Sequence, residues 1–328
     1  MESRTLFALI FVFVTVSSST VASERSTLTF AADNDGIFRV DQDYTNGIFT
    51  SYTSTVINTP SILMPLSLST KSALALDKVE FTIGHKIWTP SDIKSTKPVA
   101  NDRPYAGYFY TEFNFISLNS QQAQRVNLTL GVTGKYSFAD KAQTLVHSIT
   151  ASEEPNGWEY QIADEVVGGI GYLTHFNLSR HAVDTAEFEI ANITEINIGG
   201  FRSDVSTGIM LRWGMDLSEN MGAANIATEH SFRPGMIGAS NSAWFIFTGI
   251  EGRYRFNDMT IEGKRPNIPE PEYYPSTLEN WQSSAVFGAA WYNKYAGMSI
   301  TLAAKTADYK EAKTALYGNA GLSLFAFL

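Results

Sequence analysis

The sequence contains no cysteine among its 328 residues, and its apolar runs are short. An exported chain of this size without thiols is more typical of bacterial export than of a disulfide-stabilised eukaryotic protein. No segment after the first 23 residues has the ~18 consecutive apolar residues that a transmembrane helix requires. Basic residues are also few: 24 Lys and Arg against 33 Asp and Glu leave a net charge of −9, which argues against a nucleic-acid partner.

The first 23 residues have the arrangement of a secretory signal peptide. Arg4 supplies a positive charge, an apolar stretch runs from Leu6 to Val16, and small residues at Ala22 and Ser23 offer a cleavage site. The apolar stretch is too short to cross a bilayer as a helix. We therefore predict a signal peptide at 1–23 and an exported domain at 24–328.

Alternation of apolar and polar residues with a period of two is abundant. In residues 125–133, Val126, Leu128, Leu130 and Val132 alternate with polar neighbours. Successive side chains of a strand point to opposite faces, so each such stretch has one apolar and one polar face. Twelve stretches can be marked in this way, at 27–33, 45–56, 78–88, 105–118, 125–133, 164–178, 185–198, 204–216, 242–256, 281–293, 296–305 and 314–328.

The length of these stretches favours a membrane barrel over a soluble sandwich. Most exceed the ~5–6 residues of a globular strand and approach the ~9–11 residues of a tilted membrane strand. We predict an all-β protein, an antiparallel transmembrane β-barrel of about 12 strands, embedded as a monomer in the bacterial outer membrane. With a periplasmic N-terminus, the connection 217–241 becomes a periplasmic turn, and it is long for that role.

The external connection 134–163 contains a helical pattern. Phe138, Ala142, Leu145 and Ile149 recur at steps of four, three and four, which predicts a short amphipathic helix. His147 lies on its polar face, with Glu153 beyond its end. Imidazole titrates near neutral pH and can act as a general base, although an isolated helix histidine is commonly a solvated surface residue.

A cluster of oxygen-bearing residues ends the first predicted strand. Asp33, Asn34 and Asp35 precede a glycine, and such residues commonly form turns. Carboxylate and amide oxygens also bind calcium. A second polar cluster, which includes Thr45, begins the next strand, so an antiparallel hairpin brings both clusters to the outer rim. The sequence is therefore compatible with either a turn or a calcium site at residues 33–35.

The second external connection is basic within an acidic protein. Lys94, Lys97 and Arg103 lie there, close to Lys86 at the end of the preceding strand. One interpretation is solvated loop charges with scattered ion pairs. The other is a binding site for the phosphates of an outer-leaflet lipid, since Lys and Arg hold phosphate well.

The ordered set of these motifs resembles the lipid A 3′-O-deacylase family. The similarity covers nearly all of the chain after the signal peptide and is densest from about 28 to 172. The residues that carry it are Asn34-Asp35, Asp43-Tyr44-Thr45-Asn46-Gly47, Lys86-Ile87-Trp88-Thr89-Pro90-Ser91, Asp102-Arg103-Pro104-Tyr105-Ala106-Gly107, Gln143, His147, Glu153 and Gly157-Trp158.

The resemblance implies an enzyme that removes the 3′-linked acyloxyacyl chain of lipid A, the membrane anchor of lipopolysaccharide, in a calcium-dependent reaction. It implies an active site between the barrel wall and a helix in an external loop. His147 matches the catalytic histidine, Thr45 and Glu153 match further catalytic residues, and Asn34 and Asp35 match the catalytic and calcium-binding pair.

Two details of the match are left open. Asp33 is close enough to Asn34 and Asp35 to be an alternative calcium ligand. The family's functional lysine has no direct counterpart, because Ser95 or Thr96 falls at its position, and Lys94 or Lys97 can take its place.

The resemblance also suggests a mechanism. His147 would deprotonate a water that attacks the ester carbonyl, and calcium would stabilise the oxyanion. Two other functions fit parts of the sequence. A non-catalytic barrel, such as a porin or a structural protein, explains the strands and the signal peptide, and an outer-membrane phospholipase that uses serine and histidine is a further alternative.

Overall fold

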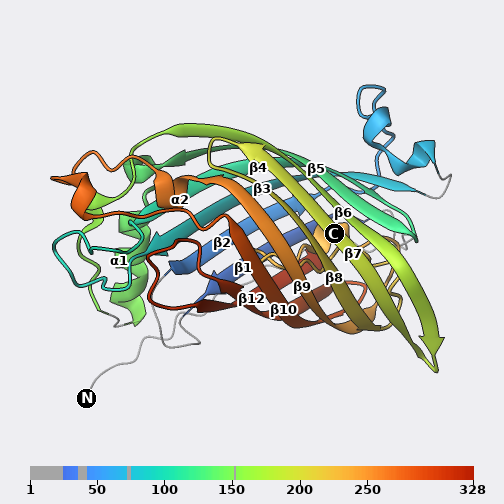
Figure 1. The fold of residues 1–328 in the computed structure, drawn as a ribbon. Coiled ribbons are helices and arrows are strands. Elements are labelled where there is room, and N and C mark those ends of the chain that lie inside the picture. Colours follow the sequence, from blue (N-terminus) through green and yellow to red (C-terminus); the bar gives the residue numbers. More distant parts are fainter. Residues whose placement is uncertain (1–24, 36–42, 72–74, 151–152) are drawn as a thin grey trace, which may run out of the picture.

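The computed structural model describes residues 25–35, 43–71, 75–150 and 153–328, so the predicted signal peptide lies outside the described residues. Twelve antiparallel strands form a closed barrel, in which each strand pairs with its sequence neighbours and β1 pairs with β12 (Figure 1). The strands are β1 (Thr27–Asn34), β2 (Asp43–Thr53), β3 (Leu76–Thr89), β4 (Ala106–Leu118), β5 (Gln122–Thr133), β6 (Val166–Val183), β7 (Ala186–Gly199), β8 (Arg202–Gly214), β9 (Ala243–Asp258), β10 (Trp281–Tyr292), β11 (Ala296–Thr306) and β12 (Leu316–Phe327).

Each of the twelve predicted stretches overlaps one of these strands, which confirms the predicted fold. Helices lie only in the connections, and none of those described is long and apolar enough to cross a membrane. They are η3 (Met64–Leu66), η4 (Leu68–Thr70), η5 (Gly134–Ser137), α1 (Ala139–Thr150), η6 (Trp158–Tyr160), η7 (Pro234–Met236), α2 (Met259–Glu262) and η8 (Pro271–Tyr273).

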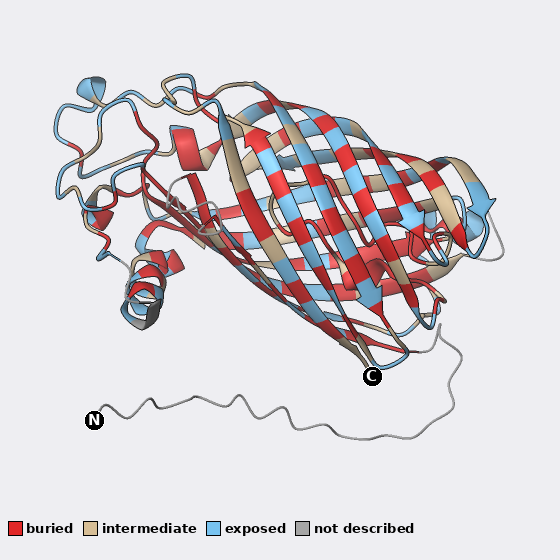
Figure 2. Cartoon of the chain, turned by 90° about the horizontal axis from the view of Figure 1, so that it is seen from below, coloured by how far each residue is buried: buried red, intermediate tan, exposed pale blue. Residues whose placement is uncertain are grey.

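The alternation in sequence becomes an alternation of burial in the barrel wall (Figure 2). On β5, Leu128 and Leu130 point outward and are exposed, whereas Arg125 and Asn127 point into the lumen and are buried. The apolar face is therefore the outer face, as expected of a wall that contacts lipid. Inside, charged side chains form ion pairs; for example, Arg253 contacts Glu195 and Asp204.

The connection 217–241 folds into the lumen instead of extending as a turn. Its apolar side chains pack on inward-facing residues of both halves of the wall: Phe232 and Ile226 lie in one buried cluster with Phe245 of β9, and Met221 and Met236 lie in another with Ile116 of β4. We call residues 217–241 the plug.

Polar contacts fix the plug to the wall. The Glu229 carboxylate pairs with Lys86 at 2.7 Å and with Arg202 at 2.7 Å. The His230 ring stacks on Phe49, with 4.3 Å between the ring centroids. Lys78 of β3 donates a hydrogen bond to the carbonyl oxygen of Ile237. The length of this connection, unusual for a periplasmic turn, is therefore explained by its role in filling the lumen.

Candidate active site at the outer rim of the barrel

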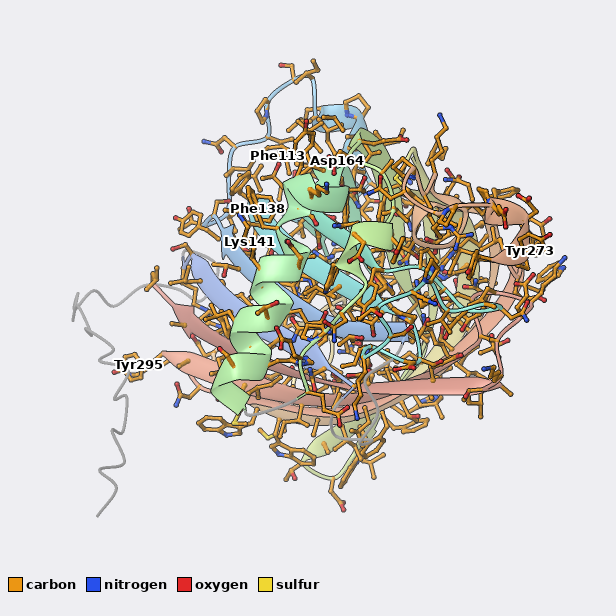
Figure 3. All side chains as sticks on the ribbon, turned by 90° about the vertical axis from the view of Figure 1, so that its left-hand side faces the viewer. Phe113, Phe138, Lys141, Asp164, Tyr273 and Tyr295 are labelled. Atoms are coloured by element: carbon orange, nitrogen blue, oxygen red, sulfur yellow. The ribbon has the colours of Figure 1, made fainter. Side chains whose placement is uncertain are left out.

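Helix α1 packs against the outer face of the wall at the end of the barrel opposite Ser26 and Leu328. It follows β5 through η5 and contacts β3 and β4. Figure 3 looks onto this end and shows Phe138 and Lys141 near the start of α1, with the helix crossing the outer ends of the strands. The predicted helix in the external connection 134–163 is thus confirmed.

The start of α1 is held by two features of the wall. A Cβ atom on Gly107, which points outward from β4, would lie 2.2 Å from the Ser137 hydroxyl oxygen and 2.3 Å from the Ala139 Cβ. Only a residue without a side chain allows so close an approach of helix and strand. His85 of β3 also points outward, and its Nε2 donates a hydrogen bond to the Ser137 carbonyl oxygen at 3.0 Å.

The buried side of the helix carries the polar residues Gln143 and His147. Ala139, Gln143 and His147, at steps of four, form the buried face, whereas Phe138 and Leu145 of the predicted apolar stripe are 58% and 61% exposed. The spacing of the stripe was predicted from the sequence, but a helix in a globular protein would bury it. Here the helix lies outside a barrel whose surroundings are apolar. Phe138 and Leu145 are therefore exposed, whereas Ala142 packs on a buried cluster that includes Trp158, and His147 is buried.

The orientation of the His147 ring is defined by the chain that follows the helix. Its Nδ1 lies 2.5 Å from the backbone carbonyl oxygen of Glu153. A carbonyl oxygen only accepts hydrogen bonds, so Nδ1 carries the hydrogen and Nε2 is the basic nitrogen of the neutral ring. The Glu153 carboxylate forms an ion pair with Lys94. Glu153 thus contacts His147 through its backbone and Lys94 through its carboxylate, while Lys97 is exposed elsewhere in the same loop.

The buried side of α1 is supported by two aromatic rings. Trp158 of η6 donates a hydrogen bond from its indole Nε1 to the Gln143 side-chain oxygen at 2.9 Å. Its ring packs on Tyr105, with 4.5 Å between the ring centroids. These contacts hold the middle of the helix, one turn before His147. The sequence indicated no role for Trp158 beyond the family resemblance, because a tryptophan in a loop belongs to no periodic pattern.

A second set of polar residues lies where β1 ends and β2 begins. The Asn34 side-chain amide and the Asp35 backbone N–H both donate to the Thr45 carbonyl oxygen, at 3.2 Å and 3.3 Å. The pairing of β2 with β3 shifts register between Tyr44 and Asn46, and such a bulge re-aims the residue it contains.

This bulge places the Thr45 hydroxyl beside a partner that the sequence did not indicate. The Thr45 and Thr89 hydroxyl oxygens are 2.6 Å apart, in hydrogen-bond contact. Thr89 ends β3, the strand on which α1 packs. The rim group of Asn34, Asp35, Thr45 and Thr89 therefore lies on β1, β2 and β3, and the helix that carries His147 lies on β3 and β4.

Asp33 faces the opposite side of β1 from Asn34. Its carboxylate accepts hydrogen bonds from the Tyr44 hydroxyl at 3.0 Å and from the His230 backbone N–H at 2.7 Å. It therefore lies in the lumen, where it contacts the plug. The structure does not bring Asp33 together with Asn34 as a joint metal ligand, because the Asp33 carboxylate is occupied by Tyr44 and by the plug.

Arg103 also lies away from the proposed lipid-facing site. Its guanidinium is buried, pairs with Asp43, donates to the Thr260 hydroxyl at 2.8 Å and lies 3.5 Å from Asp308. Burial opposes the ionisation of Asp308, but Lys305, Arg255 and Arg103 outweigh it and hold the pKa of this carboxyl below its usual range. Arg103 thus ties the outer loops together, and its burial conflicts with its predicted contact to a lipid phosphate.

The rim group supplies oxygen atoms of the kind that calcium prefers. Asp35 is 2% exposed and offers a carboxylate, Asn34 offers an amide oxygen, and backbone carbonyls lie nearby. Within the described ranges, no cluster of three or more His, Asp or Glu side chains is arranged to hold a metal. The donor types fit a calcium ion, and calcium stays a prediction.

A family model and one solved structure match nearly the whole chain. The family model described as outer membrane protein LpxR matches residues 6–326. The solved structure of LpxR from Salmonella typhimurium superposes with a TM-score of 0.77 at 17% identity, over 92% of this chain and 100% of that chain, and this likeness shows the fold. The β-domain of the Bordetella autotransporter BrkA reaches a TM-score of 0.40 at 7% identity, over 92% of this chain and 97% of its own. No curated protein sequence matches the chain.

The close approach at Gly107 predicts that Gly107→Ala displaces the start of α1. Overpacking of this kind costs about 1–3 kcal/mol, so we expect local opening of the helix connection to become roughly tenfold more frequent. Limited proteolysis between residues 134 and 163 measures this opening. Gly252→Ala is the matched control, because a Cβ atom added to Gly252 on β9 would have nothing within 4 Å. Equal cleavage of both variants would contradict the assigned contact.

Proposed function

The chain belongs to the family of the outer membrane protein LpxR, and from this premise we propose that it is an esterase that removes the 3′-linked acyloxyacyl chain of lipid A. The observation that carries the proposal is the direction of His147. This histidine is buried on a helix that exposes the apolar side chains of Phe138 and Leu145. A general base at a lipid-facing surface suits hydrolysis of a membrane lipid.

The surroundings of α1 support a lipid substrate. Phe138 and Leu145 on the helix and Phe109 and Phe113 on β4 are exposed apolar side chains on the outer face. Surfaces of this kind are stable in contact with acyl chains and unfavourable in water. An ester of an outer-leaflet lipid therefore needs only lateral movement to approach the helix and the strand ends.

In the proposed reaction, Nε2 of His147 takes a proton from a water molecule, and the water oxygen attacks the ester carbonyl carbon. The ester C–O bond then breaks, and the imidazolium returns its proton to the leaving sugar oxygen. The products are a carboxylic acid and an alcohol. The Glu153 carbonyl keeps Nδ1 protonated throughout, so Nε2 is the nitrogen that cycles. Thr45, placed by Thr89, would position the water or the substrate.

We propose calcium as the cofactor and Asn34 and Asp35 as the residues that would hold it, because they carry the oxygen donors of the rim group. Bound calcium supplies a positive charge that polarises a substrate oxygen. Lys94 is the proposed contact to a lipid A phosphate, because it pairs with the carboxylate of Glu153, whose backbone carbonyl contacts His147.

Removal of the base tests the proposed function directly. We expect His147→Ala to lower the rate of acyl release from purified lipid A by roughly 10²–10⁴-fold, the usual contribution of a general base. Mass spectrometry of the lipid product measures the rate. His181→Ala is the control, since His181 lies exposed on β6. Release by the His147 variant at the parent rate would refute the assignment, and ion conduction by the parent without hydrolysis would favour a porin.

The two lysines of the second external loop are expected to differ. Lys94→Ala removes the ion pair with Glu153 and the positive charge proposed to hold a lipid A phosphate, so we expect at least a tenfold fall in kcat/KM for lipid A. Lys97→Ala removes an equal charge from the same loop at an exposed position and should change kcat/KM less than twofold. Equal losses in both variants would show that only the overall charge of the loop matters.

Calcium dependence is expected to follow Asp35 and not Asp33. We expect Asp35→Asn to raise the calcium concentration needed for half-maximal activity at least tenfold, because one ligand charge is lost. Asp33→Asn should leave that concentration unchanged, since Asp33 contacts Tyr44 and His230 in the lumen. Calcium titrations of chelator-treated protein, followed by activity and by thermal unfolding, make the comparison. A parallel shift in both variants would place the ion elsewhere.

A further inference from the structure

The connection between β2 and β3 folds back over the outside of the barrel at the end opposite α1. Figure 1 shows this segment projecting beside the wall. It is held by a row of outward-pointing polar residues, Asp77 of β3, Ser117 of β4 and Gln124 of β5, which are neighbours across the sheet. We call residues 54–71 the foot.

Each residue of this row binds the foot. The Ser67 hydroxyl donates to the Asp77 carboxylate at 2.5 Å, and the Ser117 hydroxyl accepts from the Leu68 backbone N–H at 2.9 Å. The Gln124 side-chain amide donates to the Leu66 carbonyl oxygen. The foot is therefore fixed by hydrogen bonds to the lipid-facing side of the wall, and its own residue Leu68 is buried.

The tip of the foot exposes two apolar side chains. Ile62 is 85% exposed and Met64 is 43% exposed at its tip. Between Ser54 and Leu76 the sequence has no Asp or Glu, and Lys71 is its one charged residue, although the whole chain carries a net charge of −9. An apolar surface without carboxylates at this position is unfavourable in water and suits the interior of a bilayer rimmed by anionic headgroups.

The foot continues the lipid-facing surface of the barrel. Phe81, Phe113 and Leu128 form an exposed apolar row across β3, β4 and β5. This row lies four positions along each strand from the polar row that binds the foot, which is roughly 13 Å at ~3.3 Å per residue. The part of the foot that binds the polar row therefore lies within one leaflet's depth of a surface that already contacts acyl chains.

We propose that the foot binds the periplasmic leaflet, with Ile62 and Met64 among phospholipid acyl chains and Lys71 at the level of the headgroups. The protein then contacts both leaflets through elements outside its wall: α1 in the outer leaflet and the foot in the inner one. This role is independent of the chemistry at His147.

The absence of cysteine allows a direct test by single nitroxide labels. Ile62→Cys, labelled and folded into vesicles of phosphatidylethanolamine and phosphatidylglycerol, is compared with Leu128→Cys on the lipid-facing wall and Ser120→Cys in the exposed turn between β4 and β5. Collision with oxygen, which dissolves in lipid, is measured against collision with a water-soluble nickel chelate.

We expect the oxygen-to-nickel collision ratio at residue 62 to match that at residue 128 and to exceed that at residue 120 at least fivefold. A ratio equal to that at residue 120 would place the foot in water and overturn the proposal. Protection of residue 62 from both reagents would also overturn it, in favour of a protein contact.

A charge variant provides a second measure. Ile62→Asp combined with Met64→Asp should lower binding of the foot to the leaflet, seen as at least threefold faster protease cleavage within 54–71 in vesicles, whereas Ser120→Asp, in the exposed turn between β4 and β5, should have little effect. In detergent the double variant should release acyl chains at the parent rate. Unchanged cleavage of the double variant would contradict membrane binding without bearing on the esterase.

Discussion

The constraint on which this structure depends is the need of every backbone N–H and C=O group in the bilayer to find a partner within the protein. Lipid offers none, so a sheet in the membrane must close on itself. Here β1 pairs with β12 from Thr27 opposite Phe327 to Asn34 opposite Ala320, which removes the last open edge. Closure then fixes which face of every strand meets lipid and which meets the lumen.

This closure inverts the usual arrangement of a globular protein. Leucine and phenylalanine cover the outside, while arginine and glutamate fill the inside, where each buried charge needs a partner. The plug satisfies several of these charges through Glu229 and adds the apolar packing of Phe232. The same surroundings affect α1, which exposes Phe138 and Leu145 and buries Gln143 and His147.

The inversion also divides the residues of the candidate site between two surfaces. Asp33 and Asn34 are adjacent in sequence, yet the first contacts the plug and the second contacts Thr45 at the outer rim. Arg103 and Lys94 lie in the same outer loop. Arg103 joins the ion pairs around Asp43, whereas Lys94 pairs with Glu153. The outer rim of the barrel thus contains both the ion pairs around Arg103 and the polar groups beside α1.

The sequence by itself determined the twelve strands, the outward direction of their apolar residues and the presence of a helix around His147, because each of these follows from the spacing of neighbouring residues. Tertiary structure alone decided which side of α1 is buried, which lysine lies beside Glu153 and that 217–241 fills the lumen. It also placed Thr89 beside Thr45, through a bulge that no alternation reveals. These features arise from contacts between residues far apart in the chain, and local periodicity carries no information about them.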